Sequence, residues 1–415
     1  MTTPVANSPA PSETAASPGP VTPSNPTVHR EFETPTILAI SAAHLIHDSY
    51  PAFVGMLLPL LIPKLGISLV VAGLLAATFR LATAVQPILG HVADRADTRS
   101  WIILAPAVTA LAIGLLGVAP AVGIVAVLLV VAGISSSVFH PAAAVLVTRA
   151  SGTEWGRGTS IFMAGGESGR ALGPVVIAAV LAVVGLGWSW IAIVPGVVAS
   201  IVLYLRLAHR PSVHLTHPAG STLAALRTAR RGFLLLAGAS AMLSLASVGL
   251  LVFVPTYLTG AGADLLLAGL AVTAFSIGGA VGAFMGGTMS DRIGRRLMLA
   301  ISCAVGSPVL ILALAMPIGP AMLVVLGLAG VALLSAGPVQ LVVMQELMPE
   351  NRGAAVGLTI FAITMTSALG TVVVGALGDV IGLQPALMIS AAAALLALPF
   401  IALLPETRHV SRTPA

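Results

Sequence analysis

Residues 287–296 read Gly-Thr-Met-Ser-Asp-Arg-Ile-Gly-Arg-Arg, and residues 90–95 read Gly-His-Val-Ala-Asp-Arg. The pattern Gly-x-x-x-Asp-Arg therefore occurs twice, with its first residues 197 positions apart. A second short pattern, Arg-Gly, occurs at 157–158 and again at 352–353, a separation of 195 positions. Two patterns that repeat at nearly the same separation indicate that the chain contains a duplicated unit.

The composition is that of a membrane protein. Of the 415 residues, 57% are hydrophobic and only 8% are charged, whereas soluble domains carry about 25% charged residues. This small number of charged residues cannot cover the surface of a folded chain. The surface is therefore expected to face the lipid bilayer. The net charge of +5 does not indicate a nucleic-acid partner, because the arginines are scattered in short loops and form no patch with aromatic residues.

The chain can be divided into two sets of six apolar segments, each long enough to cross a bilayer, which takes roughly 20 residues. We therefore predict an all-α integral membrane protein with twelve transmembrane helices in an N-terminal bundle (36–206) and a C-terminal bundle (232–404), joined by a cytoplasmic linker (207–231). The predicted spans are 36–62, 70–92, 101–118, 121–147, 159–184 and 187–206, then 232–258, 264–289, 298–316, 320–346, 357–379 and 383–404.

The basic residues predict the orientation of these spans. Of the 19 Lys and Arg residues, Arg80 and Arg170 fall inside spans and Lys64 falls in an outer loop. All the others fall in segments on the side of the N-terminus, which the positive-inside rule assigns to the cytoplasm. We therefore expect a multi-pass protein of the cytoplasmic membrane with both termini in the cytoplasm. Residues 1–35 and 405–415 are expected to form cytoplasmic tails, the first of them disordered and without the features of a signal peptide.

The sequence predicts neither a cofactor nor a metal site. Its single cysteine, Cys303, lies inside an apolar segment and cannot form an intramolecular disulfide. No cluster of Cys and His has the spacing of metal ligands, and no phosphate-binding loop is present. ATP is therefore not expected to drive the protein.

The repeated pattern resembles the signature of the major facilitator superfamily, G-x-x-x-D-R-x-G-R-R. The resemblance implies the major facilitator fold, two pseudo-symmetric six-helix bundles that alternate access to a central substrate site. It also implies that Asp94 faces the start of span 357–379 and Asp291 the start of span 159–184, at the positive helix ends, latching the cytoplasmic side. The first copy departs from the signature at Asp97 and Thr98. The gating residues implied by the resemblance are Gly90, Asp94, Arg95, Gly287, Asp291, Arg292, Gly294, Arg295 and Arg296.

Four further stretches are similar to the fosmidomycin-resistance group of drug exporters within this superfamily. That group usually has a glutamate where Ala142 stands here, and uncharged polar residues where Arg80, Glu167 and Arg170 stand here. These departures bear on the substrate. The similar stretches are His-Leu-Ile-His-Asp-Ser-Tyr at 44–50, Gln-Pro-Ile-Leu-Gly at 86–90, Ser-Val-Phe-His-Pro at 137–141, and 160–174, which begins Ser-Ile-Phe and ends Gly-Pro.

The ionisable residues inside the predicted spans are candidates for coupling and binding. Each costs about 2.5–3.5 kcal/mol to insert, so such residues normally face a cavity or a partner. Asp48 is the natural proton carrier, because desolvation moves a carboxyl pKa toward the working pH. Glu167 and His140 are predicted to assist it. The predicted substrate-binding residues are Arg80, Arg170, Gln86, Tyr50 and Phe139, and the candidates to line the cavity in the second bundle are Phe253, Tyr257, Gln340, Met344 and Phe361.

Each of these roles has a structural alternative. Glu167 and Arg170 are three residues apart on one helix face and can neutralise each other. A permanent ion pair with Arg80 would keep Asp48 charged. His140 is either a proton relay or a satisfied histidine beside a proline. The histidines at 44 and 47 are expected to be packing or surface groups and not ligands.

These features together predict a monomeric secondary transporter that exports a small organic compound in exchange for protons. The alternative is an importer that moves a small organic anion together with protons, since two guanidinium groups suit a carboxylate or phosphonate. An intramembrane enzyme is not expected, because no nucleophile or metal set accompanies the acidic residues. A receptor that binds a ligand without moving it is the remaining alternative.

Overall fold

The computed structural model describes residues 31–86, 89, 98–208 and 222–407, and these residues form helices and connecting turns. Within these described residues, eleven helical segments are long and apolar enough to cross a membrane, and a shorter apolar helix, α2 (Leu69–Thr83), accompanies them. The expected span at 70–92 corresponds to α2, and the end of that span lies partly outside the described residues. The all-helical architecture predicted from the sequence is confirmed.

The first half contains α1 (Thr34–Leu65), α2, α4 (Arg99–Gly114), α5 (Val122–Ala150), α6 (Trp155–Val184) and α7 (Ile193–Leu207). The second half contains α8 (Thr222–Gly260), α9 (Leu265–Ile293), α10 (Arg295–Ala315), α11 (Pro320–Leu334), α12 (Ala336–Leu347), α13 (Arg352–Ile381), α14 (Leu383–Ala393) and α15 (Ala397–Leu403). The pairs α11–α12 and α14–α15 each form one span. Helix α8 begins ten residues before the expected span at 232, and its membrane-spanning part begins at Ala229.

The duplication is visible in how corresponding helices begin. Ser68 caps α2 by accepting a hydrogen bond from the N–H of Val71, and Asp264 caps α9 by accepting one from Leu267. These caps are 196 residues apart, which matches the separation of the sequence repeats. The two halves therefore repeat in local structure as well as in sequence.

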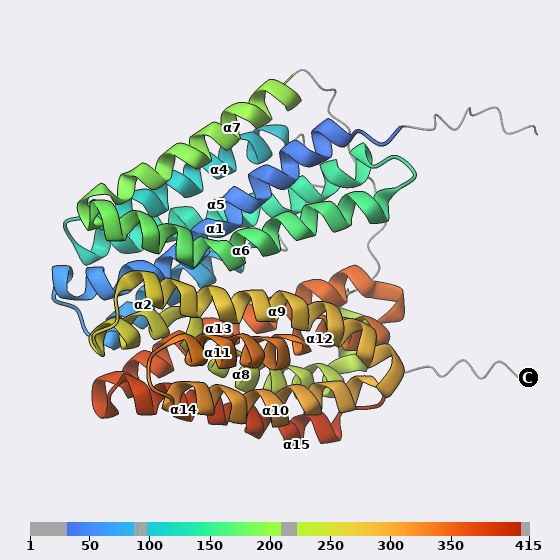
Figure 1. Ribbon diagram of the computed structural model, residues 1–415. Helices are drawn as coiled ribbons and strands as arrows, with labels where there is room; N and C mark the ends of the chain where they lie inside the picture. The colour runs from blue at the N-terminus through green and yellow to red at the C-terminus, as the bar shows by residue number, and fades with distance from the viewer. Residues whose placement is uncertain (1–30, 87–88, 90–97, 209–221, 408–415) are drawn as a thin grey trace, which may run out of the picture.

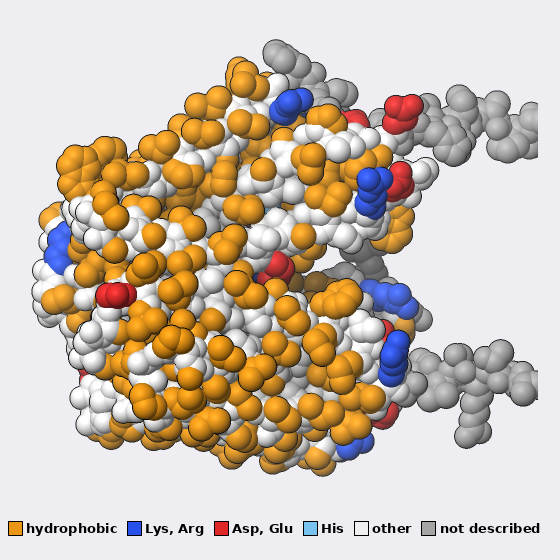
Figure 2. Space-filling model, in the orientation of Figure 1, with side chains coloured by type: hydrophobic (Ala, Val, Ile, Leu, Met, Phe, Trp, Pro, Cys, Tyr) orange, Lys and Arg blue, Asp and Glu red, His pale blue; other side chains and the backbone are white. Residues whose placement is uncertain are grey.

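The helices form two lobes (Figure 1). The lobes contact each other through α2 with α13, α6 with α9, and α1 with α8. A hollow separates the lobes on the side where the described part of the chain begins and ends, here called the tail end (Figures 1 and 2). Figure 2 also shows most of the visible Lys and Arg side chains at this tail end. On the face that it shows, hydrophobic side chains cover much of both lobes and charged ones are few, as a lipid-facing surface requires.

Close contact between α1 and α6 positions the site described below. Three glycines on one face of α6, Gly165, Gly169 and Gly173, lie against the backbone carbonyls of Ser41, Leu45 and Ser49 on α1. A Cβ atom at any of the three would be too close to these carbonyl oxygens. Small residues allow helix backbones to approach in this way, and the approach brings the polar side chains of α1 and α6 within reach of each other.

Candidate functional site

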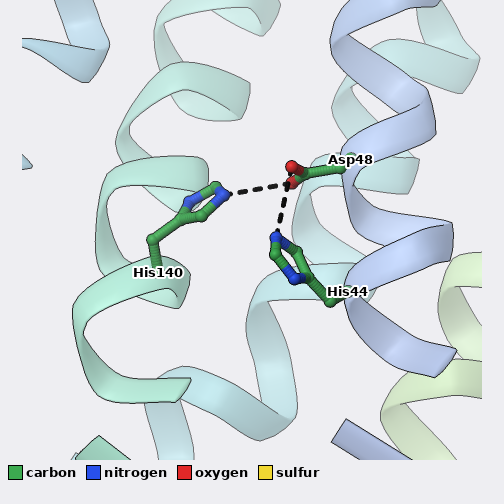
Figure 3. A group of neighbouring side chains, drawn as sticks. All are labelled: His44, Asp48 and His140. Carbon is green, nitrogen blue, oxygen red and sulfur yellow. Dashed lines mark ion pairs between the residues drawn. The ribbon is translucent and has the colours of Figure 1, made fainter. Parts of the chain in front are cut away.

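Asp48 lies at the centre of a cluster of ionisable side chains in the N-terminal lobe (Figure 3). Its side chain is only 3% exposed. His44, one turn earlier on α1, has its Nε2 3.2 Å from Oδ2 of Asp48. His140, from α5, has its Nε2 3.1 Å from Oδ1. The two imidazoles thus approach the two oxygens of one carboxylate.

Arg170, from α6, joins this cluster to a second carboxylate. Its Nη1 donates to Oδ2 of Asp48 over 2.5 Å, and its Nη2 donates to Oε1 of Glu167. The side chains of Arg170 and Glu167 are 43% and 46% exposed, in contrast to that of Asp48. The ion-pair network therefore runs from a buried carboxylate to an accessible one.

Hydrogen bonds and ring contacts fix both imidazoles. Nδ1 of His44 is 2.8 Å from the carbonyl oxygen of Phe162, and the rings of His44 and Phe162 stack with their centroids 4.0 Å apart. Nδ1 of His140 is 2.8 Å from the carbonyl oxygen of Ser136, one turn earlier on its own helix. Each ring therefore uses Nδ1 for the backbone and leaves Nε2 for Asp48.

The structure brings together four of the predicted residues: Asp48, His140, Glu167 and Arg170. It pairs Asp48 with Arg170 and not with Arg80, which has no carboxylate partner among the described residues. The ring of His44 is buried, as expected of a packing group, and it also contacts Asp48.

Two predicted substrate-binding residues are enclosed by protein in this conformation. Tyr50 is 1% exposed and donates a hydrogen bond to the carbonyl of Ala192 over 2.6 Å. Phe139 is fully buried and stacks on His47, with ring centroids 4.4 Å apart. In this conformation both side chains are packed among protein atoms, and their contact with a substrate stays a prediction.

A cavity of about 200 Å³ lies between the two lobes. Gln86, a predicted binding residue, lines it, as does Phe361 from the second lobe. Of the other candidates in the second lobe, Phe253 and Met344 are fully buried, and Gln340 accepts a hydrogen bond from Ser240. The cavity is lined by Thr83, Ala84, Gln86, Pro141, Gly353, Val356, Gly357, Ile360, Phe361 and Thr364.

The second copy of the gating motif forms its own ion-pair network. Arg295 donates to Ser290, Asp291 and Glu346, and so links the end of α9 and the start of α10 to α12. Asp291 thus pairs with Arg295, and its predicted contact with the start of span 159–184 stays a prediction. Gly294 adopts a positive φ of 100° between α9 and α10, and Arg296 donates to the carbonyl of Ala402.

The first copy of the motif cannot be compared in the same way, because Gly90, Asp94 and Arg95 lie outside the described residues. The repeated pattern in the sequence does not predict the ion pair of Glu346 with Arg295 in the second copy. In the sequence, this role is indicated by the position of Glu346, which lies at the end of a predicted span and opposite a basic loop.

Within the described part of the chain, one group of side chains has the spacing of metal ligands: His44, Asp48 and His140, whose ligand atoms all lie within 4.8 Å of one another. The guanidinium of Arg170 already bonds to the same carboxylate. A divalent cation there would lie beside a fixed positive charge, which opposes its binding. The cluster therefore does not favour a divalent cation.

Comparison with known proteins decides the family. The pattern of conserved residues that defines the Major Facilitator Superfamily matches residues 41–270 and 236–415 of this chain. The chain belongs to the major facilitator superfamily.

Two bacterial proteins of the superfamily are similar over most of their length. The fosmidomycin resistance protein of Escherichia coli is 29% identical over 384 residues, which cover 89% of this chain and 93% of that protein. The uncharacterized MFS-type transporter YfnC of Bacillus subtilis is 28% identical over 375 residues, covering 85% of this chain and 89% of YfnC. The predicted resemblance to the fosmidomycin-resistance group is therefore confirmed.

Solved structures of superfamily transporters share the fold. A bacterial homolog of the human lysosomal transporter Spinster, in an inward-facing and unoccupied conformation, superimposes with a TM-score of 0.77 at 16% identity, covering 91% of this chain and 98% of that one. The nucleoside transporter NupG superimposes with a TM-score of 0.74 at 15% identity, covering 89% and 99%. The chain is thus a membrane transporter of the twelve-helix major facilitator fold.

Proposed function

We propose that this transporter exports a small organic compound in exchange for protons, with Asp48 as the proton-coupling residue. The observation that carries the proposal is the buried carboxylate of Asp48, held between two imidazoles and the guanidinium of Arg170. Ionisable groups in a transmembrane bundle cost free energy, and those retained there commonly mark ion pathways.

Proton binding changes the electrostatics of this site in a defined way. While Asp48 is ionised, it holds Arg170 through a short charge-assisted hydrogen bond. A proton on the Asp48 cluster weakens that bond and leaves Arg170 with the accessible Glu167 as its remaining partner. The exposed guanidinium and Glu167 are then free to change their contacts with a substrate, which links proton binding to substrate release.

Alternating access supplies the second part of the mechanism. The hollow between the lobes opens at the tail end (Figure 2), and the exposed atoms of Arg170, Glu167 and His140 give the cluster access to solvent. We assign the tail end to the cytoplasm because the basic residues gather there. A monomer in the cytoplasmic membrane is sufficient for this cycle, since one chain contains both lobes.

The similarity to the fosmidomycin resistance protein supports export over import. The opposite direction, uptake of a small organic anion with protons, is favoured by one observation. Arg80 is a guanidinium in a spanning helix with no carboxylate partner among the described residues, and such a group suits an anionic substrate.

A transport experiment distinguishes the two directions. The wild-type chain and its Asp48→Asn variant are produced at equal membrane levels in an efflux-deficient bacterium, and survival and intracellular accumulation are measured across a panel of antibacterial compounds. Export predicts that the wild type lowers the accumulation of at least one compound and that Asp48→Asn does not. Increased accumulation with the wild type would establish import, and full protection by the variant would remove Asp48 from the mechanism.

A further inference from the structure

His44 is held in a way that packing alone does not require. The residue is 2% exposed, and its Nδ1 lies 2.8 Å from the carbonyl oxygen of Phe162. A carbonyl oxygen can only accept a hydrogen bond, so Nδ1 carries the hydrogen. In the neutral ring, Nε2 then carries no hydrogen and presents a lone pair. This atom lies 3.2 Å from Oδ2 of Asp48.

This arrangement is incomplete without a further proton. An ionised carboxylate is also an acceptor only, so a neutral His44 places a lone pair against a lone pair. Both Nε2 of His44 and Oδ1 of Asp48 are buried, and neither has a hydrogen-bond partner among the described residues. A proton on Nε2 converts this contact into an ion pair. His140 has the same anchoring through Nδ1 and the same approach to Asp48.

The charges around His44 favour the uptake of one proton. Asp48 and Glu167 are two negative charges, and Arg170 is one positive charge, so a single added proton makes the cluster neutral. The other groups that face His44 are the ring of His140 from α5, 5.3 Å away, and the apolar rings of Phe139 and Phe162. From its own helix, the buried His47 stacks on Phe139, which also contacts His44.

We propose that His44 is a second proton-binding residue of the coupling site, with Nε2 as the atom that gains the proton. The cluster then binds its proton at either of two imidazoles, the accessible one of His140 (27% exposed) or the buried one of His44 (2% exposed). A proton from water adds to the Nε2 lone pair while Nδ1–H stays bonded to Phe162. The link between this proton and transport rests on the proposed function.

Gly166 of α6 provides a specific way to disturb His44. A Cβ atom at this position would lie 2.5 Å from Nε2 of His44. The Gly166→Ala substitution therefore displaces the imidazole while every titratable group stays in the chain. Gly156, near the start of the same helix, has no atom within 4 Å of the corresponding Cβ position, so Gly156→Ala is the matched control.

Solid-state ¹⁵N NMR of the full chain in lipid bilayers, with labelled histidine rings, tests the proposal. The chain has nine histidines, and the signals of two of them are assigned by their loss in His44→Gln and His140→Gln. We expect the Nδ1 of His44 to stay protonated and its Nε2 to gain a proton as the pH falls from about 9 to about 5. Asp48→Asn and Gly166→Ala are each expected to lower that proton affinity about tenfold, and Gly156→Ala to leave it unchanged.

Two results overturn the proposal: a His44 whose Nε2 stays unprotonated over this whole range, or one whose Nδ1 carries no hydrogen. Because the NMR signals need no substrate, the outcome is separate from that of the transport experiment. Proton-driven export together with a His44 whose Nε2 gains no proton would overturn only the present inference. A titrating His44 without any proton-driven flux would overturn only the proposed function.

Discussion

The carboxylate of Asp379, at the end of α13, accepts a hydrogen bond from the backbone N–H of Leu69 at the start of α2, over 2.8 Å. Its other oxygen accepts one from Val70, also over 2.8 Å. These N–H groups belong to the first turn of α2, and the N–H groups of a first turn have no hydrogen-bond acceptors within their own helix. A residue of the second lobe therefore caps a helix of the first lobe, at the end of the molecule opposite the tails.

The contact closes one end of the molecule in this conformation. Thr371, two turns earlier on α13, donates to the carbonyl of Gly73, so the same two helices are joined at a second point. In the second half, the corresponding cap of α9 comes from Asp264 of its own segment. Helix α2 is also capped from its own segment, by Ser68, so the hydrogen bonds to Asp379 are additional to the cap that the two halves share.

We expect Asp379→Ala to shift the protein away from this closed conformation. The substitution removes two charge-assisted hydrogen bonds between the lobes, and a free-energy change of about 1 kcal/mol or more alters the ratio of conformations about fivefold. Spin labels at Ile67→Cys and Val380→Cys, on a Cys303→Ser background, report the distance between the lobes at this end. We expect a larger population of long distances.

Glu154→Gln is the control for this prediction. Glu154 is also an exposed carboxylate, but it pairs with Arg157 within the first lobe. Its loss is expected to leave the distance distribution unchanged. An Asp379→Ala distribution identical to that of the wild type would show that the cap does not hold the lobes together.

The buried position of Asp48 makes the loss of Arg170 costly. Removing one partner of a fully buried ion pair costs about 3–5 kcal/mol, and the 43% exposure of Arg170 brings the expected cost below that range. Arg170→Ala should lower the midpoint of thermal unfolding in detergent. Glu167→Gln should lower it less, because Glu167 is half exposed and leaves no buried charge.

A double variant isolates the cause. In Asp48→Asn/Arg170→Ala no buried carboxylate is left without its partner, so part of the lost stability should return. If the double variant is less stable than Arg170→Ala alone, the guanidinium stabilises the fold through packing and not through its pairing with Asp48.

The sequence predicted the fold more completely than it predicted the partners within the site. Runs of apolar residues set the spans, and the repeated Gly-x-x-x-Asp-Arg pattern indicated the duplication, because both depend on local composition. The pairing of Asp48 with Arg170, and not with Arg80, depends on how α1, α2 and α6 are rotated about their axes. That rotation is set by packing contacts, such as those of the α6 glycines, which single-sequence periodicity does not resolve.

The missed residues have the same explanation. Asp379 and Leu69 are 310 positions apart, and nothing in the sequence around either one indicates the other. His44 was interpreted as a packing or surface residue, although it lies one turn before Asp48 on the same helix. Its contact with Asp48 follows from an anchor, the carbonyl of Phe162, that only the three-dimensional arrangement provides.

Gly169 is expected to be the least replaceable glycine of α6. A Cβ atom there would overlap the carbonyl of Leu45, which belongs to the backbone of α1 and cannot rotate away. Overpacking a close contact costs about 1–3 kcal/mol. Gly169→Ala should therefore lower the thermal midpoint and separate α1 from α6, and the open-space substitution Gly156→Ala should not. Equal midpoints for the two variants would contradict this account of the helix contact.

The final prediction concerns Glu346, which holds Arg295 at the second copy of the gating motif. Arg295 is 11% exposed and bonds to both Glu346 (24% exposed) and Asp291 (66% exposed). Ion pairs weaken with exposure to water. Glu346→Gln should therefore lower the thermal midpoint more than Asp291→Asn does, although the motif in the sequence contains the aspartate and not the glutamate. A larger loss for Asp291→Asn would show that the motif aspartate supports the fold through contacts other than Arg295.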